Sequence, residues 1–141
     1  MLIALKDRLD DPAVRSIVEC SVYPDPDKLD ETIAAYRSED GMEMYGLEAE
    51  GECIAIIGLR MSEERVLKIE HLAVSPDYRG LGYGRGILLE TIDKKRPAVL
   101  IAETDDDAVD FYRAIGFEIE SLGEAYPGVE RFNCVYLVEP E

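Results

Sequence analysis

The stretch of sequence that decides the fold reads Val74-Ser75-Pro76-Asp77-Tyr78-Arg79-Gly80-Leu81-Gly82-Tyr83-Gly84-Arg85-Gly86. An apolar segment precedes it and an amphipathic one follows it, which predicts a strand, a glycine-rich turn and a helix. Glycine lets the backbone adopt positive φ and lets a ligand approach the amides without an intervening Cβ. At a helix N-terminus, free amides and the helix dipole favour an anion. The stretch predicts an anion-binding turn; the alternative is a flexible surface turn.

The spacing of the glycines distinguishes this turn from two other phosphate loops. A Walker loop needs Lys followed by Ser or Thr after Gly-x-x-x-x-Gly, but Arg85 stands five residues after Gly80. The dinucleotide pattern Gly-x-Gly-x-x-Gly also fails, because its last position falls on Arg85 or Ile87. Both failures disfavour a phosphate-binding enzyme such as a small kinase.

The chain is strongly acidic overall and basic around the glycines. Lys and Arg number 15 and Asp and Glu 31, so the formal net charge is 15 − 31 = −16. This balance argues against nucleic acid and anionic membranes as partners and favours cationic ones, unless it serves only solubility. Residues 79–96 hold five basic and two acidic residues, a net charge of +3. The local excess supports an anionic ligand at the glycines.

Length and composition predict one cytoplasmic domain spanning residues 1–141. The 47% of apolar residues suffices for one core. The apolar N-terminal run is too short for a signal peptide, and no stretch approaches the about 18 apolar residues of a membrane helix. The cysteines Cys20, Cys53 and Cys134 are scattered without metal-ligand spacing. We therefore expect reduced, mostly buried thiols and no metal site.

The periodicity predicts an α/β fold of the α+β type, a mixed sheet flanked by helices. Helices are expected from Asp10-Asp11-Pro12 to about residue 20, around 29–37 with an end at Gly41, and over 84–95 and 105–115. Strands are expected over 1–5, 42–50, 53–61, 66–75, 98–102, 117–121 and 131–138. Short turns join the strands between 42 and 75, which predicts an antiparallel meander there. Strands and helices then alternate.

The glycine-rich stretch also resembles a known family. Arg79-Gly80-Leu81-Gly82-Tyr83-Gly84 is similar to the Arg/Gln-x-x-Gly-x-Gly/Ala acyl-CoA pyrophosphate loop of the GNAT superfamily of N-acetyltransferases. Residues 69–76 resemble that family's fourth strand. Residues 108–117 resemble its second signature, a helix ending in Phe/Leu-Tyr-x-x-x-Gly-Phe. The resemblance covers residues 66–121 and implies a mostly antiparallel sheet of about six to seven strands with about four helices, in which strands four and five form a splayed parallel pair.

The resemblance implies acetyl-CoA as the co-substrate and direct acetyl transfer to a primary amine in a ternary complex. The backbone amides of the turn would hold the pyrophosphate, and two arginines would add charge. The pantetheine arm would pair with the end of strand four, where an N–H would also stabilise the developing oxyanion. The residues implied in cofactor binding are Leu72, Ala73, Val74, Arg79, Gly80, Leu81, Gly82, Tyr83, Gly84 and Arg85.

Tyr112 matches the position from which family members often protonate the departing thiolate. A phenol suits this role, because its usual pKa near 10 is close to that of a leaving thiol. The alternative is that Tyr112 only packs against the pantetheine arm. Asp105 stands seven residues earlier, where the family often has Asn. We expect Asp105 to contact the cofactor. Together with Asp106 and Asp107, it also suits the N-terminus of a helix.

The base that accepts the amine proton has three candidates. Glu70 alternates along its strand with Lys68 and opposes His71, so it is expected to project toward the amine. Its alternative role is an ion pair with a neighbour. His71, the single histidine, has a suitable pKa but shares a face with apolar residues, which favours a buried, hydrogen-bonded side chain. Glu103 is the third candidate, and a water chain also remains open.

The acceptor cannot be read from the sequence, and a small amine or a peptide or protein amine both remain open. Specificity is expected from residues 23–29 and 123–132, the latter with Tyr126-Pro127-Gly128 as a turn near the substrate. A homodimer is also left open. The competing functional class is a catalytically silent acyl-CoA-binding regulatory module. The presence of both Tyr112 and Glu70 favours the enzyme.

Overall fold

The computed structural model describes residues 2–21, 26–38, 41–106 and 108–138. Two short 3-10 helices, Lys6–Arg8 and Pro76–Tyr78, accompany four α-helices and seven strands in the predicted order. The elements are β1 (Ile3–Ala4), α1 (Pro12–Ser21), α2 (Pro26–Ser38), β2 (Met42–Ala49), β3 (Glu52–Met61), β4 (Val66–Val74), α3 (Tyr83–Lys95), β5 (Val99–Asp105), α4 (Val109–Ile115), β6 (Glu118–Tyr126) and β7 (Val129–Leu137).

The strands form one mixed sheet in the order β1-β2-β3-β4-β5-β7-β6. The β1–β2, β2–β3, β5–β7 and β6–β7 pairs are antiparallel, and β4 and β5 are parallel. The parallel register runs from Val66–Val99 to Ile69–Ala102 among the described residues, although β4 continues to Val74 and β5 to Asp105. The parallel pairing of strands four and five is thus confirmed, and their splay stays a prediction.

Contacts within the chain define two compact units. The first comprises Met1–Arg60 and Glu70–Arg96, and the second Met61–Ile69 and Pro97–Glu141. One of the three boundaries between them lies inside β4, directly after Ile69, where the ladder with β5 ends. The expectation of a single domain stays a prediction.

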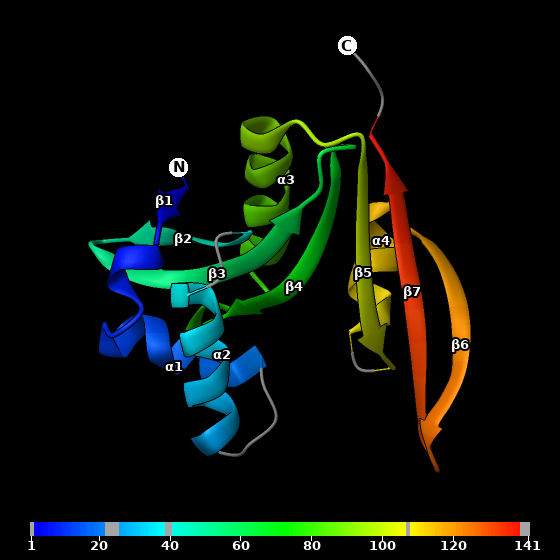
Figure 1. Ribbon diagram of the computed structural model, residues 1–141, viewed down its shortest axis with the longest axis horizontal. Helices are drawn as coiled ribbons and strands as arrows, with labels where there is room; N and C mark the ends of the chain where they lie inside the picture. The colour runs from blue at the N-terminus through cyan, green and yellow to red at the C-terminus, as the bar shows by residue number, and fades with distance from the viewer. Residues whose placement is uncertain (1, 22–25, 39–40, 107, 139–141) are drawn as a thin grey trace. The chain divides into compact units, whose positions relative to one another are not determined.

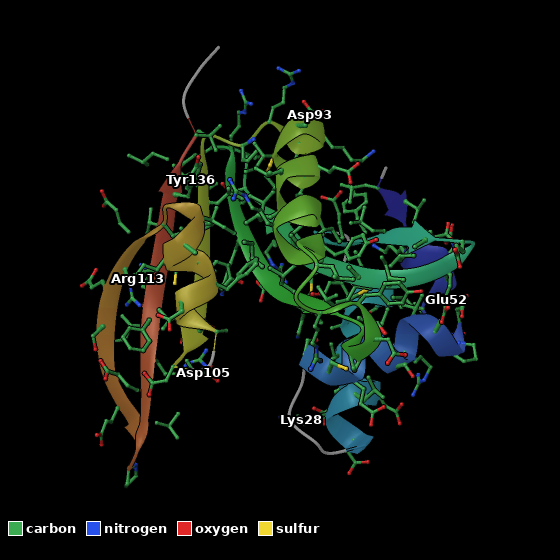
Figure 2. The ribbon with its side chains drawn as sticks, turned by 180° about the vertical axis from the view of Figure 1, so that it is seen from behind. Lys28, Glu52, Asp93, Asp105, Arg113 and Tyr136 are labelled. Carbon is green, nitrogen blue, oxygen red and sulfur yellow. The ribbon has the colours of Figure 1, made fainter. Side chains whose placement is uncertain are left out.

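In the first unit, α1 and α2 cover one face of the strands and α3 lies on the other face (Figures 1 and 2). The α1 helix begins as predicted, because the Asp11 carboxylate accepts a hydrogen bond from the Ala13 amide at 3.0 Å. Val14, Ile17 and Val18 recur at helical spacing and are buried. They pack into a core with side chains of α2, β2 and β3.

In the second unit, β6 and β7 form a long hairpin and α4 packs behind β5 and β7 (Figure 1). Gly116 ends α4 as predicted, with φ of 116° and its amide donating to carbonyls of the last helical turn. The hairpin corrects one expectation. Residues 123–132 are mostly paired strand, with register contacts from Gly123–Arg131 to Tyr126–Val129, rather than a long variable loop. Only Pro127 and Gly128 form the turn.

Two predicted boundaries around Asp105 were wrong for the same reason. The strand expected over 98–102 extends to Asp105, because Glu103, Thr104 and Asp105 continue the ladder with β7. The helix expected to start at Asp105 therefore starts at Val109, and its N-cap is Ala108, which makes no side-chain capping bond. Asp107, part of that expectation, and residues 23–25 of the expected specificity segment lie outside the described residues.

Candidate active site

The glycine-rich turn connects the end of β4 to the first turn of α3 within the first unit. Gly80 and Gly82 have φ values of 78° and 88°, which residues with a Cβ rarely adopt. Gly82 is the N-cap of α3, and its carbonyl accepts the Gly86 amide at 2.9 Å. The amides of Tyr83, Gly84 and Arg85 precede that bond, so they lie in the first turn, where amides have no intrahelical acceptor. The turn has the backbone of an anion site.

Side chains around the turn hold its shape and carry its charge. The Arg79 guanidinium Nε donates to the Val74 carbonyl at 3.1 Å, which ties the turn to the end of β4. The rings of Tyr78 and Tyr83 meet edge to face at 6.0 Å across the turn. Arg85 is exposed on α3. Leu81 is exposed by 67%.

Burial alternates along residues 66–70, the first part of β4, as the sequence predicted. Leu67 and Ile69 are buried, whereas Lys68 is exposed and Glu70 half-buried. Leu72, Ala73 and Val74, the proposed partners of the pantetheine arm, are half-buried and belong to the part of β4 that follows the ladder with β5.

His71 has the hydrogen-bonded environment expected from the apolar face that it shares. The Tyr36 hydroxyl lies 2.5 Å from His71 Nδ1, and the two rings meet at 5.4 Å. Burial lowers the pKa of His71, and the nearby Glu70 carboxylate opposes this effect. Burial also raises the pKa of Tyr36, so the phenol stays protonated. Sequence reasoning missed Tyr36, because its bond to His71 joins residues 35 positions apart.

The lowered pKa of His71 predicts a pH-dependent stability. Unfolded His titrates near pH 6.5, so below about that value the unfolded chain binds a proton that the folded chain rejects. The free energy of unfolding should therefore fall as the pH drops from about 6.5 toward the lower folded-state pKa, by at most about 1.4 kcal/mol per pH unit. Urea denaturation between about pH 5.5 and 7.5 measures this slope, above the usual carboxyl titration range. His71→Asn should flatten it, and an unchanged slope in that variant would contradict the assignment.

Tyr112 lies on α4 in the second unit, within an aromatic cluster. Its ring contacts those of Phe111 and Phe117, each at 5.1 Å between centroids, and it is 6% exposed. Burial, with a smaller effect from Cys134, raises the pKa of Tyr112 above its usual value. The phenol therefore stays protonated, and the raised pKa makes it a weaker acid than the usual phenol whose pKa is close to that of a thiol.

The two acidic residues at the end of β5 also belong to the second unit. Glu103 is half exposed and lies 3.6 Å from the Arg131 guanidinium, which engages it in an ion pair. Asp105 is the last residue of β5, where the chain turns toward α4 (Figure 2). Its carbonyl accepts the Ala108 amide at 3.3 Å.

The comparisons with known proteins decide the family. The sequence matches the acetyltransferase (GNAT) family over residues 11–117, which is most of the chain and includes both the glycine-rich turn and Tyr112. The chain belongs to the GNAT family. As a GNAT acetyltransferase it is an acyltransferase, and the resemblance to this family is confirmed.

Individual GNAT relatives are distant in sequence and close in fold. An uncharacterised N-acetyltransferase of Bacillus methanolicus is 26% identical over 88 residues, which are 62% of this chain and 73% of the relative. A GNAT-family acetyltransferase structure from Desulfovibrio desulfuricans has a TM-score of 0.82 at 19% identity, and covers 99% of both chains. A GNAT acetyltransferase from Elizabethkingia anophelis with acetyl-CoA bound has a TM-score of 0.70 at 16% identity, over 98% and 97% of the two chains.

Two further observations concern membrane-spanning helices and metal sites. Among the described helices, none is long and apolar enough to cross a membrane. Within the described residues, no three His, Cys, Asp or Glu side chains are grouped so that they could hold a metal ion.

Proposed function

We propose that this GNAT protein is an N-acetyltransferase that moves the acetyl group of acetyl-CoA directly to a primary amine. The observation that carries the proposal is the glycine-rich turn, with two glycines at positive φ leading into free amides at the start of α3. Its position in the sequence matches the family's pyrophosphate loop. Acetyl-CoA bound to a relative of the same fold supports the choice of co-substrate.

We propose that the glycine-rich turn and the end of β4 hold the cofactor, and the family resemblance adds Asp105 and Tyr112 as cofactor contacts. The amides of residues 80–85 would bind the pyrophosphate, and Arg79 and Arg85 would supply positive charge. The backbone of Leu72, Ala73 and Val74 would pair with the pantetheine arm as an added strand does. An N–H of the same segment would stabilise the oxyanion of the tetrahedral intermediate.

The chemical step requires a base and an acid. Glu70 would accept a proton from the acceptor ammonium, directly or through water, so that the amine nitrogen can attack the thioester carbon. The new C–N bond forms, the C–S bond breaks, and Tyr112 would protonate the departing thiolate. The second nitrogen proton leaves to solvent or to the base. The alternation along β4, which places Glu70 on the strand face opposite His71, favours Glu70 over the other candidates.

The acceptor is a small amine or a peptide or protein amine, and the net charge of −16 supports a cationic one. The deciding experiment measures thiol release from acetyl-CoA against panels of amines, amino acids, polyamines and peptides. Release with at least one class supports the enzyme. Binding of CoA without turnover on any of them would instead indicate the silent regulatory module. Failure to bind CoA would contradict both functions.

The glycine-rich turn makes its own prediction. Gly82→Ala forces a Cβ into a left-handed conformation, at a cost of about 1 kcal/mol, and should displace the first amides of α3. We expect the KM for acetyl-CoA to rise about tenfold with a smaller change in kcat. Steady-state kinetics and CoA binding by calorimetry check this.

The matched control is Gly86→Ala in the same helix. A Cβ at Gly86 would meet no atom within 4 Å, and its φ lies outside the left-handed region. This variant should keep the wild-type KM and gain about 0.5–1 kcal/mol of stability, as Ala does over Gly inside a helix. If both variants bind CoA like the wild type, the turn does not hold the pyrophosphate.

A further inference from the structure

We propose that Tyr36 is a positioning residue for acetyl transfer, which acts through His71 on the catalytic part of β4. The inference rests on the proposed function, because it concerns the strand segment to which that function assigns Glu70 and the pantetheine contacts. Tyr36 lies in α2, outside both family motifs, the glycine-rich turn and the signature on α4.

The buried side chain of Tyr36 links α2 to β4. Tyr36 is 1% exposed, and its hydroxyl lies 2.5 Å from His71 Nδ1. The rings meet at an interplanar angle of 62°, so the imidazole is held by an edge contact as well as by the hydrogen bond. Tyr36 is buried and His71 half-buried, so losing the hydrogen bond would leave the buried hydroxyl unsatisfied, and this favours one arrangement of the two side chains.

Tyr36 packs against β3 at Gly58, where the absence of a side chain leaves room for the phenol. A Cβ built on Gly58 would lie 1.9 Å from the Tyr36 hydroxyl oxygen and 2.5 Å from the adjacent ring carbon. No side chain larger than hydrogen fits there while the phenol keeps its place. Gly58 has no positive φ, so close packing against Tyr36 is the reason for glycine at this position.

The hydrogen bond from Tyr36 holds β4 at His71, just beyond the point where pairing with β5 ends. Among the described residues, the ladder with β5 ends at Ile69, two residues before His71. The segment beyond it carries Glu70 and the Leu72–Val74 backbone. Because side chains alternate along a strand, a bond that fixes His71 on the α2 face also fixes the direction of Glu70 on the opposite face. A small displacement of such a group costs catalysis steeply.

We call the Tyr36–His71 hydrogen bond the anchor of β4. This structural role of His71 differs from a role as the base. The Nδ1 atom faces the Tyr36 hydroxyl, which leaves Nε2 as the other ring nitrogen. An anchor needs only a hydrogen-bonding partner for the hydroxyl at the Nδ1 position. Asparagine offers an amide group there, which can donate or accept, and it cannot titrate. His71→Asn thus separates the two roles.

The test compares Tyr36→Phe with a matched control, Tyr45→Phe. Both variants remove one hydroxyl from a buried tyrosine of the first unit, since the Tyr45 hydroxyl donates to the Glu43 carboxylate. We expect Tyr36→Phe to lower kcat about tenfold, with the KM for acetyl-CoA within about threefold. Tyr45→Phe should keep the wild-type kcat. His71→Asn should stay within about threefold of the wild type, and Tyr36→Phe should add nothing in a His71→Leu background.

Three results would overturn the proposal. One is a wild-type kcat in Tyr36→Phe, and another is an equal loss in Tyr45→Phe, which would indicate a general effect of destabilisation. The third is loss of activity in His71→Asn together with the acidic limb of the pH–rate profile, which would make His71 the base. Amide hydrogen exchange of residues 70–74 gives a readout without turnover, and faster exchange in Tyr36→Phe supports the anchor. If the wild type releases no thiol with any amine, the proposed function fails, and exchange still tests the anchor.

Discussion

Tyr112→Phe is expected to lower kcat about 100-fold while the KM for acetyl-CoA stays within about threefold. The variant keeps the ring that packs between Phe111 and Phe117 and removes only the hydroxyl. The thiolate then has to leave without a proton or wait for one from water. Steady-state kinetics with the best acceptor, and calorimetric binding of CoA, measure the two quantities separately.

The pKa of Tyr112 adds a pH criterion. Because burial raises it, the phenol stays protonated up to and beyond its usual value of about 10. Loss of the Tyr112 proton therefore should not reduce kcat between about pH 7 and 10. Tyr136→Phe is the matched control, since Tyr136 packs on Phe117 in the same cluster. Unchanged turnover in Tyr112→Phe would remove the residue as the acid and leave it a packing role.

Glu70→Gln is expected to lower kcat about 100-fold as well, because an amide of the same shape cannot accept the acceptor's proton. Glu103→Gln and His71→Asn are the comparison variants for the other two candidate bases. Glu103→Gln should keep the wild-type kcat. It removes only the ion pair with Arg131, which is half exposed and contributes little to stability. The measurement is kcat for each variant at a saturating amine concentration across the pH range.

The pattern of losses identifies the base. A loss confined to Glu70→Gln supports the proposed mechanism. A wild-type rate in Glu70→Gln with a large loss in either comparison variant would reassign the role. Wild-type rates in all three would indicate that a water chain removes the proton.

Local signals in the sequence predicted most of the fold. The Asp11-Pro12 helix start, the Gly116 helix end and the alternation along the first part of β4 depend on neighbouring residues, and the structure shows all three. The errors arose where a distant strand decides the conformation. Glu103 to Asp105 contain two acidic residues with low strand propensity, yet β7 pairs with them and extends β5. The β6–β7 hairpin is longer than predicted for the same reason.

The candidate site divides in the same way. The glycine-rich turn and Tyr112 lie in contiguous motifs, so the family resemblance could be recognised without a structure. The Tyr36–His71 bond joins residues far apart in sequence, and its geometry depends on Gly58 of a third element. A lone histidine on an apolar face predicted that a partner exists. It could not predict which residue that partner is.

The β6 strand has a consequence for the behaviour of the protein in solution. It is the last strand of the sheet, so one of its edges is open. Its register shifts twice, between Ser121 and Gly123 and between Glu124 and Tyr126, and such bulges spoil the straight row of amides and carbonyls that a foreign strand would use. The exposed glutamates Glu118, Glu120 and Glu124 repel a second copy of the same strand. Although Leu122 is half exposed on this edge, the irregular backbone and the charge together protect the hairpin against fibrous aggregation.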